Sequence, residues 1–473
     1  MRTIQYPIPQ AQPLGGIAAS TVREFKGLNT FDPLSIPDSF FSDSSNMCSR
    51  DYPAASVREG YTVLGTPIGT KCTGLGVWED KKLIGAFNDG TWRVWSGSAW
   101  SAPIFTYSST DPEAVNRMWS FTNFQGSYPQ VNLIGCNGMG GLYRYNGSTA
   151  ISIAKSPLGS NFVTTYQNRL WVAINKEIQS CALDQPEVWD LFGGTDEDSY
   201  RKDIESSRGG LINALSGGLT KLTIGLPNEI RELYGGVPSD FSDRSVTEDL
   251  GFSNNQSVVT QEGIMRFLHK SGIYQYAGGL LPSKNFSEVV SNYPYTVDTD
   301  SAAGSDGSNL YFSVGDSLLV YDPREGVASW SVWKGIRATC FAQMGGDFYI
   351  GDAQGRVVKL GGSTDAGTPI NWHATTKPFN NQAASQKSRW YKMWAVVELA
   401  AGSSLNVYLS RSVKGDSDWE LVQTVNGTGI GVQRVIVPVS KYALENWVRV
   451  KIQGTGWARI NELTRSTRQM PLY

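Results

Sequence analysis

The sequence is poor in histidine, with only His269 and His373 among its 473 residues. They lie about 100 residues apart, in segments that we assign below to different domains. A histidine-based catalytic triad or zinc site needs serine, cysteine or carboxylate partners near the imidazole, so this scarcity argues against both. The G-x-x-x-x-G-K-S/T phosphate-binding loop is also missing. We therefore predict that the protein is not an enzyme, and we assign it no catalytic, cofactor-binding or metal-binding residue and no cofactor.

Long apolar runs and paired cysteines are absent as well. No stretch approaches the roughly 18 apolar residues of a membrane span, so we expect none. Residues 1–16 contain three prolines and no apolar core, which argues against a signal peptide. Without a C-x-x-C pair, the odd and scattered set of thiols favours reduced, buried cysteines made in a cytoplasm over a disulfide framework. These cysteines are Cys48, Cys72, Cys136, Cys181 and Cys340.

Charged residues make up only 18% of the chain and nearly cancel, with a formal net charge of −2. A chain without excess positive charge is not expected to hold nucleic acid tightly. The balance is uneven, however. Residues 365–473 contain 13 Lys and Arg against 7 Asp and Glu, a net charge of +6, which leaves −8 for residues 1–364. These opposite charges fit either solvated faces of two unrelated domains or complementary surfaces between neighbouring subunits.

Glycine and aromatic residues are plentiful, with 51 glycines and 11% aromatics, as is typical of turn-rich all-β proteins. One pattern recurs: an alternating apolar strand, a short turn with Gly, Asn or Asp, and a second strand ending in an aromatic residue. Its starts are on average about 44 residues apart, which is the period of four-stranded propeller blades. The seven starts are Leu83, Leu133, Leu170, Leu222, Met265, Leu310 and Phe348.

A single hairpin cannot bury its apolar face, whereas blades around an axis cover each other's faces. We therefore predict an all-β fold, a β-propeller of about six to eight blades with a C-terminal β-sandwich domain. Two β-sandwiches in tandem would also use short strands, but they give no reason for a regular period. The segments GLGVWED, TTYQNR and CFAQMGGD precede three of the hairpins and are expected to form inner strands.

The composition predicts three regions. Residues 1–75 are expected to form an extended N-terminal arm, rich in Asp, Ser and Pro, that leads into the first blade. This arm is also a candidate to close the ring by pairing with the last blade. Residues 76–362 are expected to form the propeller. Residues 363–473 alternate in longer runs, such as MWAVVEL and VQRVIVPVS, and are expected to form the C-terminal sandwich.

Two loops are rich in acidic residues. Oxygen-rich loops can bind Ca²⁺, but neither loop has the EF-hand spacing with its closing Glu, so solvated loops are the favoured interpretation. The acidic residues are Asp196, Glu197 and Asp198 in one loop and Asp298, Asp300 and Asp306 in the other.

Two segments, 88–95 (NDGTWRVW) and 412–422 (SVKGDSDWELV), faintly resemble the Asp box of sialidase propellers. That box is a folding turn and does not establish hydrolysis. A sialidase would need three arginines and a Tyr/Glu pair that converge on the propeller axis. The candidate arginines Arg93, Arg144 and Arg231 are instead predicted on outer parts of hairpins.

Tryptophans are frequent around the first hairpin. They could stack on sugar rings, but tryptophan at strand positions is more often packed between blades. The residues concerned are Trp92, Trp95 and Trp100.

Segments from three parts of the chain together indicate a known family. They are the N-terminal FKGLN…DPLSIPDSFF and DYPAASVREGYTVLG, the late blades LLVYDPREGVASWSVWKG and FYIGDAQGRVVKL, and the C-terminal LNVYLSRSVKGDSDWELV…NWVRVKIQGTGWARINELTRSTR. On these segments the chain resembles, over nearly its full length, the tail nozzle proteins of short-tailed bacteriophages, also called packaged-DNA stabilisation proteins. The C-terminal segment resembles the closing strands of that family.

The resemblance implies a virion protein of the phage tail, synthesised in the cytoplasm of the bacterial host. It implies a homo-hexameric ring that extends the DNA channel below the portal and the head–tail adaptor, and that helps to retain and then release the genome. It also implies contacts with tail fibre, spike or plug proteins, while double-stranded DNA passes through without specific binding. Two alternatives stay open: another tail hub or fibre-attachment component, and a carbohydrate-binding or carbohydrate-cleaving, sialidase-like propeller.

Overall fold

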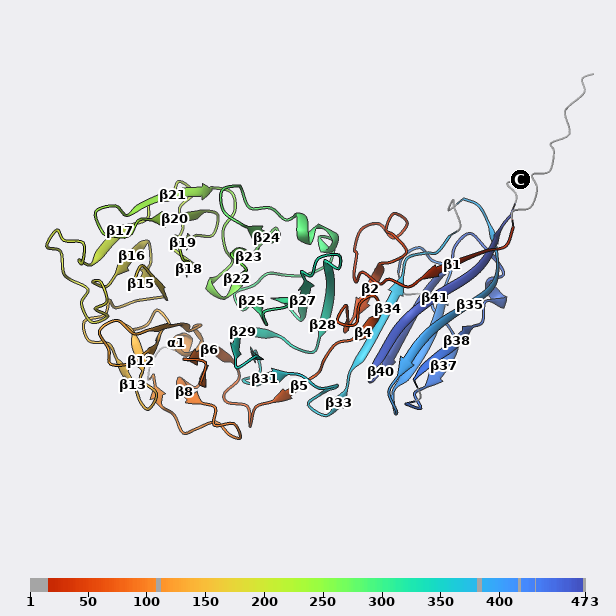
Figure 1. The fold of residues 1–473 in the computed structure, drawn as a ribbon, viewed down its shortest axis with the longest axis horizontal. Helices are drawn as coiled ribbons and strands as arrows, with labels where there is room; N and C mark the ends of the chain where they lie inside the picture. The colour runs from red at the N-terminus through yellow and green to blue at the C-terminus, as the bar shows by residue number, and fades with distance from the viewer. Residues whose placement is uncertain (1–15, 108–111, 381–384, 416–417, 430, 471–473) are drawn as a thin grey trace, which may run out of the picture.

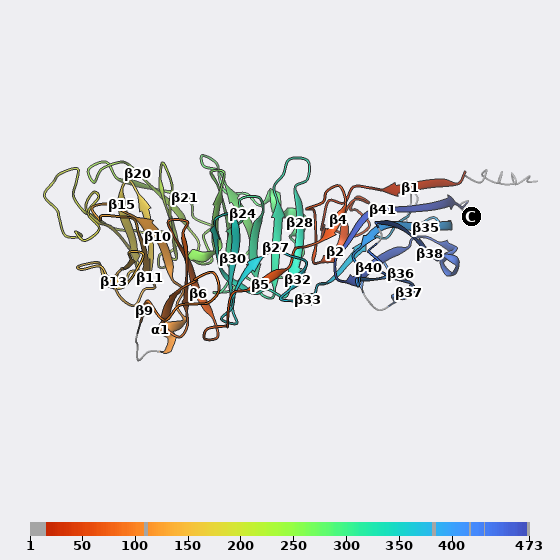
Figure 2. The ribbon, with the colours of Figure 1, turned by 60° about the horizontal axis from the view of Figure 1, so that its bottom comes forward.

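The computed structural model describes residues 16–107, 112–380, 385–415, 418–429 and 431–470. A ring of small sheets occupies one end of the long axis, and a pair of packed sheets occupies the other (Figures 1 and 2). The expectation that the chain has no signal peptide rests on residues 1–16, nearly all of which lie outside the described residues.

Seven antiparallel sheets surround a common axis and form a β-propeller, which confirms the predicted fold class (Figure 1). Each of the seven predicted hairpins supplies the second and third strands of one blade, because apolar strands joined by tight polar turns pair antiparallel. The first four blades are β6 (Cys72–Trp78), β7 (Lys82–Phe87), β8 (Thr91–Val94) and β9 (Phe105–Thr106); β10 (Ser120–Phe124), β11 (Asn132–Cys136), β12 (Tyr143–Tyr145) and β13 (Ala150–Ser152); β14 (Phe162–Tyr166), β15 (Arg169–Ile174), β16 (Glu177–Ser180) and β17 (Tyr200–Asp203); and β18 (Ala214–Gly217), β19 (Leu222–Gly225), β20 (Ile230–Tyr234) and β21 (Ser242–Thr247).

The last three blades are less uniform. Blade 5 has three strands, and blade 7 is completed by strands from outside the repeats. Their elements are β22 (Val258–Gln261), β23 (Ile264–His269) and β24 (Gly272–Tyr276); β25 (Ala302–Ser305), β26 (Leu310–Val314), β27 (Ser317–Asp322) and β28 (Ser329–Lys334); and β29 (Ala338–Met344), β30 (Asp347–Asp352) and β31 (Val357–Leu360) with β5 (Tyr61–Val63), β32 (Thr364–Asp365) and β33 (Thr368–Pro369).

The N-terminal part of the chain closes the ring. Strand β5 pairs antiparallel with β31, with Val63 opposite Val358, so the last blade is completed by a strand that precedes the first blade in sequence. At the inner side of the same seam, the Thr339 hydroxyl donates a hydrogen bond to the Cys72 carbonyl at 2.6 Å. The expectation that the arm pairs with the last blade is therefore confirmed.

Aromatic side chains fill the spaces between blades. Trp92 is fully buried and contacts Trp119 and Phe121 of the second blade, with ring centroids 4.7 and 5.0 Å away. A Cβ atom at Gly135 would lie 2.7 Å from the rings of both Trp92 and Phe121, so only glycine fits there. Trp92 is thus core, as its strand position predicts.

Two sheets pack face to face in the C-terminal region (Figure 1). Their facing side chains include Met393, Val397, Leu405 and Val450, all fully buried. The sheet that we call the β35 sheet contains β3 (Met47–Cys48), β4 (Ala55–Val57), β41 (Ala458–Gln469), β35 (Ser388–Leu399) and β38 (Val432–Val437), with β1 (Ala18–Val22) on β41 and β39 (Leu444–Glu445) on β35. The other, the β36 sheet, contains β2 (Phe41–Ser45), β34 (Asn371–Thr376), β40 (Arg449–Thr455), β36 (Ser404–Ser410) and β37 (Glu420–Asn426).

The N-terminal segment differs from the separate arm that the composition suggested. Strands β1 to β4 lie within the two sheets of the sandwich, and β2 pairs with β34 while β4 pairs with β41. The described part of residues 1–75 is therefore shared between sandwich and propeller. These pairings join residues more than 300 positions apart, so no local pattern reveals them.

Helices are few and short. They are α1 (Pro112–Asn116), η1 (Asn255–Ser257), η2 (Asn285–Val290) and η3 (Ser440–Tyr442). Within the described ranges, no helix has the length and apolar character to cross a membrane.

Candidate functional site

Backbone and side-chain hydrogen bonds hold the joint between propeller and sandwich. Strand β28, the outer strand of blade 6, accepts backbone hydrogen bonds from the N-terminal segment: Leu28 N donates to Trp330 O and Asn46 N donates to Val332 O, both at 2.8 Å. In return, Lys334 N donates to the side-chain oxygen of Asn46 at 2.8 Å. Backbone and side-chain hydrogen bonds therefore link blade 6 to the N-terminal segment, whose strands β1 to β4 belong to the sandwich.

Arg58 is the centre of this joint. Its side chain is fully buried and donates two hydrogen bonds to the Asp365 carboxylate, at 2.8 and 2.7 Å. Its Nε donates to Asn46 Oδ1 at 2.9 Å, and another nitrogen donates to Lys334 O at 3.1 Å. Such a planar, bidentate pair fixes geometry as well as charge. One side chain thus ties the N-terminal segment, blade 6 and strand β32 of blade 7 together.

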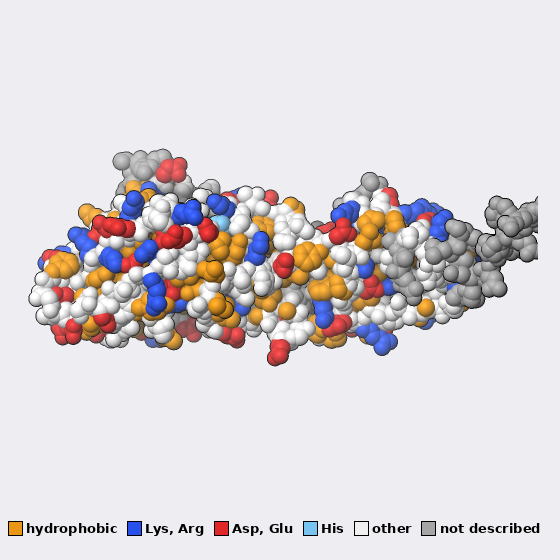
Figure 3. All heavy atoms as spheres, turned by 90° about the horizontal axis from the view of Figure 1, so that it is seen from above, with side chains coloured by type: hydrophobic (Ala, Val, Ile, Leu, Met, Phe, Trp, Pro, Cys, Tyr) orange, Lys and Arg blue, Asp and Glu red, His pale blue; other side chains and the backbone are white. Residues whose placement is uncertain are grey.

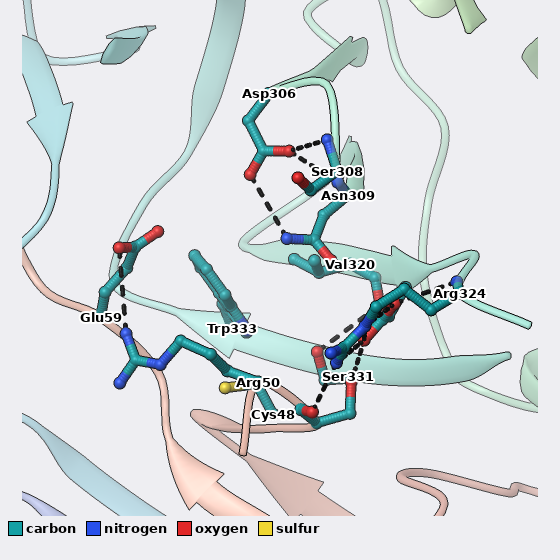
Figure 4. Close-up of a pocket in the computed structure, with 12 residues that line it drawn as sticks. Cys48, Arg50, Glu59, Asp306, Ser308, Asn309, Val320, Arg324, Ser331 and Trp333 are labelled. Carbon is teal, nitrogen blue, oxygen red and sulfur yellow. Dashed lines mark hydrogen bonds and ion pairs between the residues drawn. The ribbon is translucent and has the colours of Figure 1, made fainter. Parts of the chain in front are cut away.

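A pocket of about 330 Å³ opens beside this joint, between blade 6 and residues 48–59 (Figure 4). On one wall, Ser49 Oγ donates to Asp322 at 2.7 Å, and Arg324 binds the same carboxylate at 2.6 Å. Burial alone would raise the pKa of Asp322, but the hydrogen bonds from Arg324 and Ser49 outweigh it and lower the pKa below its ordinary value. Asp322 therefore acts as an anchor for the joint.

The other walls of the pocket include Asp306, Glu59 and Cys48. Asp306 accepts hydrogen bonds from the backbone of its own turn and from Tyr311. Burial raises the pKa of Glu59. The Arg50 guanidinium, 4.0 Å from the Glu59 carboxylate, offsets this rise only in part. Burial also raises the pKa of the Cys48 thiol. A nucleophile needs a lowered pKa or an adjacent base, and the pocket contains no histidine.

The segment at η1 occupies part of the centre of the propeller, and a pocket of about 160 Å³ remains beside it, lined by residues that include Ser120 and Asn213. The segment at η1 reaches across the axis from blade 5 to blade 2, where the Gln256 side chain donates to Trp119 O at 2.9 Å. Asn255 accepts a hydrogen bond from Leu215 N of blade 4 at 2.9 Å, and Asn254 donates to Ser301 O next to blade 6 at 2.8 Å. We call residues 254–257 the axial plug. It cross-links four blades and narrows the centre, where a propeller could otherwise form a pore.

The two histidines lie in different domains and do not share a site. His269, on β23, is buried; its pKa is lowered by burial, and its Nδ1 lies 2.7 Å from Ser271 Oγ. His373, on β34 of the sandwich, has its Nε2 2.9 Å from Asp43. No group of three or more His, Cys, Asp or Glu side chains with metal-binding geometry occurs among the described residues.

The acidic loops are used for turns and ion pairs. Asp198 accepts hydrogen bonds from the backbone of Gly194 and from the Thr195 hydroxyl. Asp300 pairs with Lys71 at 2.6 Å, and Arg337 lies 3.4 Å from Asp298. Asp198, Asp298 and Asp300 are thus matched by donors of this chain, whereas the Asp196 and Glu197 carboxylates have no hydrogen-bond or ion-pair partner among the described residues.

The candidate arginines do not converge on the axis. They lie on the third strands of blades 1, 2 and 4, in the outer half of each sheet. Arg93 lies 3.3 Å from Asp89, Arg231 pairs with Glu229 and Asp243, and Arg144 covers the ring of Tyr128 at 4.3 Å. In the segment that resembles an Asp box, Asp89 accepts hydrogen bonds from Thr91 and so forms a folding turn.

No local sequence pattern points to the residues that build the joint. Arg58 and Asp365 are 307 positions apart, and Ser49 and Asp322 are 273 apart. The only local hint is that Arg58 follows β4 in an otherwise apolar and small-residue segment.

No protein-family model matches the chain, and no curated protein matches it in sequence. Among solved structures, the WD40 β-propeller domain of Doa1 is similar, with 12% identity and a TM-score of 0.41 over 64% of this chain and 97% of that one. The Neurospora crassa Pan2 WD40 domain gives 10% identity and a TM-score of 0.43 over 67% and 97%. BamB from Moraxella catarrhalis gives 12% identity and a TM-score of 0.37 over 64% and 99%. These likenesses concern the propeller fold alone.

Proposed function

We propose that this protein is a structural component of a short-tailed bacteriophage virion, a tail nozzle subunit. Copies of the chain form a ring, expected to be a hexamer, below the portal and adaptor. The ring extends the DNA channel and helps to retain and then release the genome. The observation that carries the proposal, together with the sequence resemblance, is the rigid joint at Arg58, which makes one stiff body of propeller and sandwich.

A stiff body suits a mechanical role. A ring that holds a pressurised genome needs subunits that do not bend between their domains. The Arg58–Asp365 ion pair and the backbone hydrogen bonds from Leu28 and Asn46 to β28 resist such bending. The absence of converging catalytic side chains among the described residues supports the same reading, because the joint pocket and the axis contain no activated nucleophile.

The axial plug indicates where DNA would pass. Because residues 254–257 cross the propeller centre and the pocket beside them is only about 160 Å³, a DNA channel would have to lie between subunits, along the axis of the ring. Acidic and basic side chains are interspersed over the face of the propeller seen in Figure 3, which is favourable for a surface that DNA slides past. Tight DNA binding depends on many Lys and Arg contacts to phosphates.

The expected partners follow from this position. They are other copies of this chain, the adaptor protein above, and tail fibre, spike or plug proteins. A carbohydrate-cleaving propeller is less well supported, because Arg93, Arg144 and Arg231 are each engaged on separate outer strands.

Immunogold electron microscopy of virions from the phage that encodes the chain tests the proposal. We expect antibody against the protein to label the tail axis of intact particles. Protein that is free in the lysate and missing from particles would refute the tail role and direct attention to glycan arrays and sialidase assays.

A further inference from the structure

The outward face of the β35 sheet carries an exposed apolar patch at the edge of the sandwich. Strand β38 is the edge strand, and its Val432 and Ile436 side chains are each 63% exposed. In the strand register Ile436 lies opposite Trp394 and Arg434 lies opposite Val396, so these side chains share one face. We call Trp394, Val396, Val432, Arg434 and Ile436 the β38 patch. Exposed apolar side chains gathered on one sheet face mark interaction surfaces.

The β38 patch is bordered by positive charge. Arg434, Arg389 and Lys392 are exposed, and none makes an ion pair with another described residue. The carboxylates on the same face are already matched: Glu398 lies 3.9 Å from Arg459, and Glu462 pairs with Arg23 at 2.8 Å. A partner for this face should therefore offer apolar side chains next to unpaired carboxylates.

Such a surface exists on the same chain, in the long connection between β16 and β17. Leu191 and Phe192 are 40% and 60% exposed, and the exposed acidic residues Asp190, Asp196 and Glu197 flank them. We call residues 190–197 the acidic loop. It combines an apolar tip with carboxylates, which is the complement of the β38 patch.

The acidic loop is held in shape although its tip is exposed. The buried guanidinium of Arg169 donates hydrogen bonds to the backbone carbonyls of Asp196, at 2.6 Å, and of Asp198. Ser199 N donates to Leu191 O at 2.9 Å. Fixing the exposed apolar pair in advance lowers the entropy cost of binding, as in preorganised interfaces.

The two surfaces lie at opposite ends of the molecule. The connection between β16 and β17 is at the end of the propeller farthest from the sandwich (Figures 1 and 2). They cannot meet within one chain, but they can meet between two copies. A contact between two different surfaces of identical subunits is heterologous, and it closes into a ring when the rotation permits.

We infer that the acidic loop of one copy docks on the β38 patch of the next copy. Phe192 and Leu191 cover Ile436 and Val432, and Asp196 and Glu197 face Arg434. This inference rests on the proposed function, since it names the contact by which the ring would close. The net charges of the two regions, −8 for residues 1–364 and +6 for residues 365–473, favour the same head-to-tail order.

Paired cysteine substitutions in the full-length chain test the contact. Oxidation of a variant that combines Phe192→Cys with Ile436→Cys should produce a ladder of disulfide-linked oligomers on a non-reducing gel. The matched control combines Leu280→Cys with Ile436→Cys, because Leu280 is 82% exposed but lies outside the proposed contact. That control and each single variant should give no ladder beyond that of the wild type.

A charge reversal makes the test independent of oxidation. We expect Arg434→Glu to weaken self-association about tenfold or more, measured by sedimentation velocity. Adding Asp196→Lys and Glu197→Lys should restore most of the loss. Because all three side chains are exposed, folding should be unaffected, which circular dichroism can verify.

The outcomes separate the contact from the tail role. If the wild type forms rings and neither the cysteine pair nor the charge reversal has its expected effect, the contact is refuted and the ring stands. If the wild type remains monomeric at every concentration while antibody still labels virion tails, the contact is also refuted and the tail role stands. Monomeric protein that is also missing from virions overturns both.

Discussion

Replacing the buried Arg58 with alanine should weaken the joint between propeller and sandwich and lower the free energy of unfolding. The substitution removes five hydrogen bonds, to Asn46, Glu59 O, Lys334 O and twice to Asp365. Removing one partner of a buried ion pair costs about 3–5 kcal/mol, because the other charge is left without its counterion. Asp365 is 19% exposed and can be partly hydrated, so we expect a loss near the lower limit, about 3 kcal/mol.

Urea denaturation followed by tryptophan fluorescence measures this loss, since Trp333 lies under the Arg58 guanidinium at 5.5 Å. The matched control is Lys414→Ala. Lys414 pairs with Asp32 at 3.2 Å, but both side chains are more than half exposed, so its loss should cost about 0–1 kcal/mol. Arg58→Lys keeps the positive charge but lacks the planar guanidinium, so its loss of stability should lie between those of Arg58→Ala and Lys414→Ala.

Limited proteolysis gives a second readout that is specific to the joint. In Arg58→Ala, cleavage between residues 361 and 369 should become faster, because Asp365 no longer holds this segment against blade 6. An Arg58→Ala variant with the stability and cleavage rate of Lys414→Ala would refute the assignment of Arg58 as the residue that holds the joint.

Three further predictions concern the anchors of the fold. Because the folded protein holds the pKa of Asp322 below its ordinary value of 3.8, the stability that this carboxylate contributes is complete above about pH 4 and is lost as the pH falls through the lower folded-state pKa. Asp322→Asn should reduce the fall in the free energy of unfolding that the wild type shows below about pH 4. The same fall in the variant and the wild type would contradict this prediction. Gln256→Ala should lower the free energy of unfolding by about 1 kcal/mol, the usual net value of one hydrogen bond, and should speed hydrogen exchange at β10. Unchanged exchange at β10 would mean that the axial plug does not stabilise blade 2. Burial raises the pKa of the thiols of Cys72 and Cys136, and that of Cys181 to about 12, so disulfide reagents at pH 8 should label these thiols slowly in the folded protein and quickly in urea. Fast labelling without urea would show that they are not buried.

The repeating part of the fold could be predicted from local patterns. Each hairpin, such as the one from Leu222, combines alternating apolar residues with a polar turn, and both signals lie within about 15 residues. The segments GLGVWED, TTYQNR and CFAQMGGD do lie in or overlap the inner strands β6, β14 and β29. The runs MWAVVEL and VQRVIVPVS likewise contain or overlap β35 and β38.

The joint could not be predicted in this way. Asn46, Arg58 and Asp365 come together only after strands β2 and β4 have joined the sandwich, and β4 has only three residues. Short strands with polar residues carry weak periodicity, and their partners are set by tertiary packing. The axial plug is a similar case, because Asn254 to Ser257 has the composition of an ordinary loop.

The most direct test of the central claim is cryo-electron microscopy of the phage tail at a resolution that separates the blades. We expect a closed ring of this chain around the DNA channel, with propeller and sandwich in the fixed relation of Figure 1 and each propeller axis crossed by residues 254–257. A tail without this chain, or DNA density running through the propeller axis, would contradict the claim.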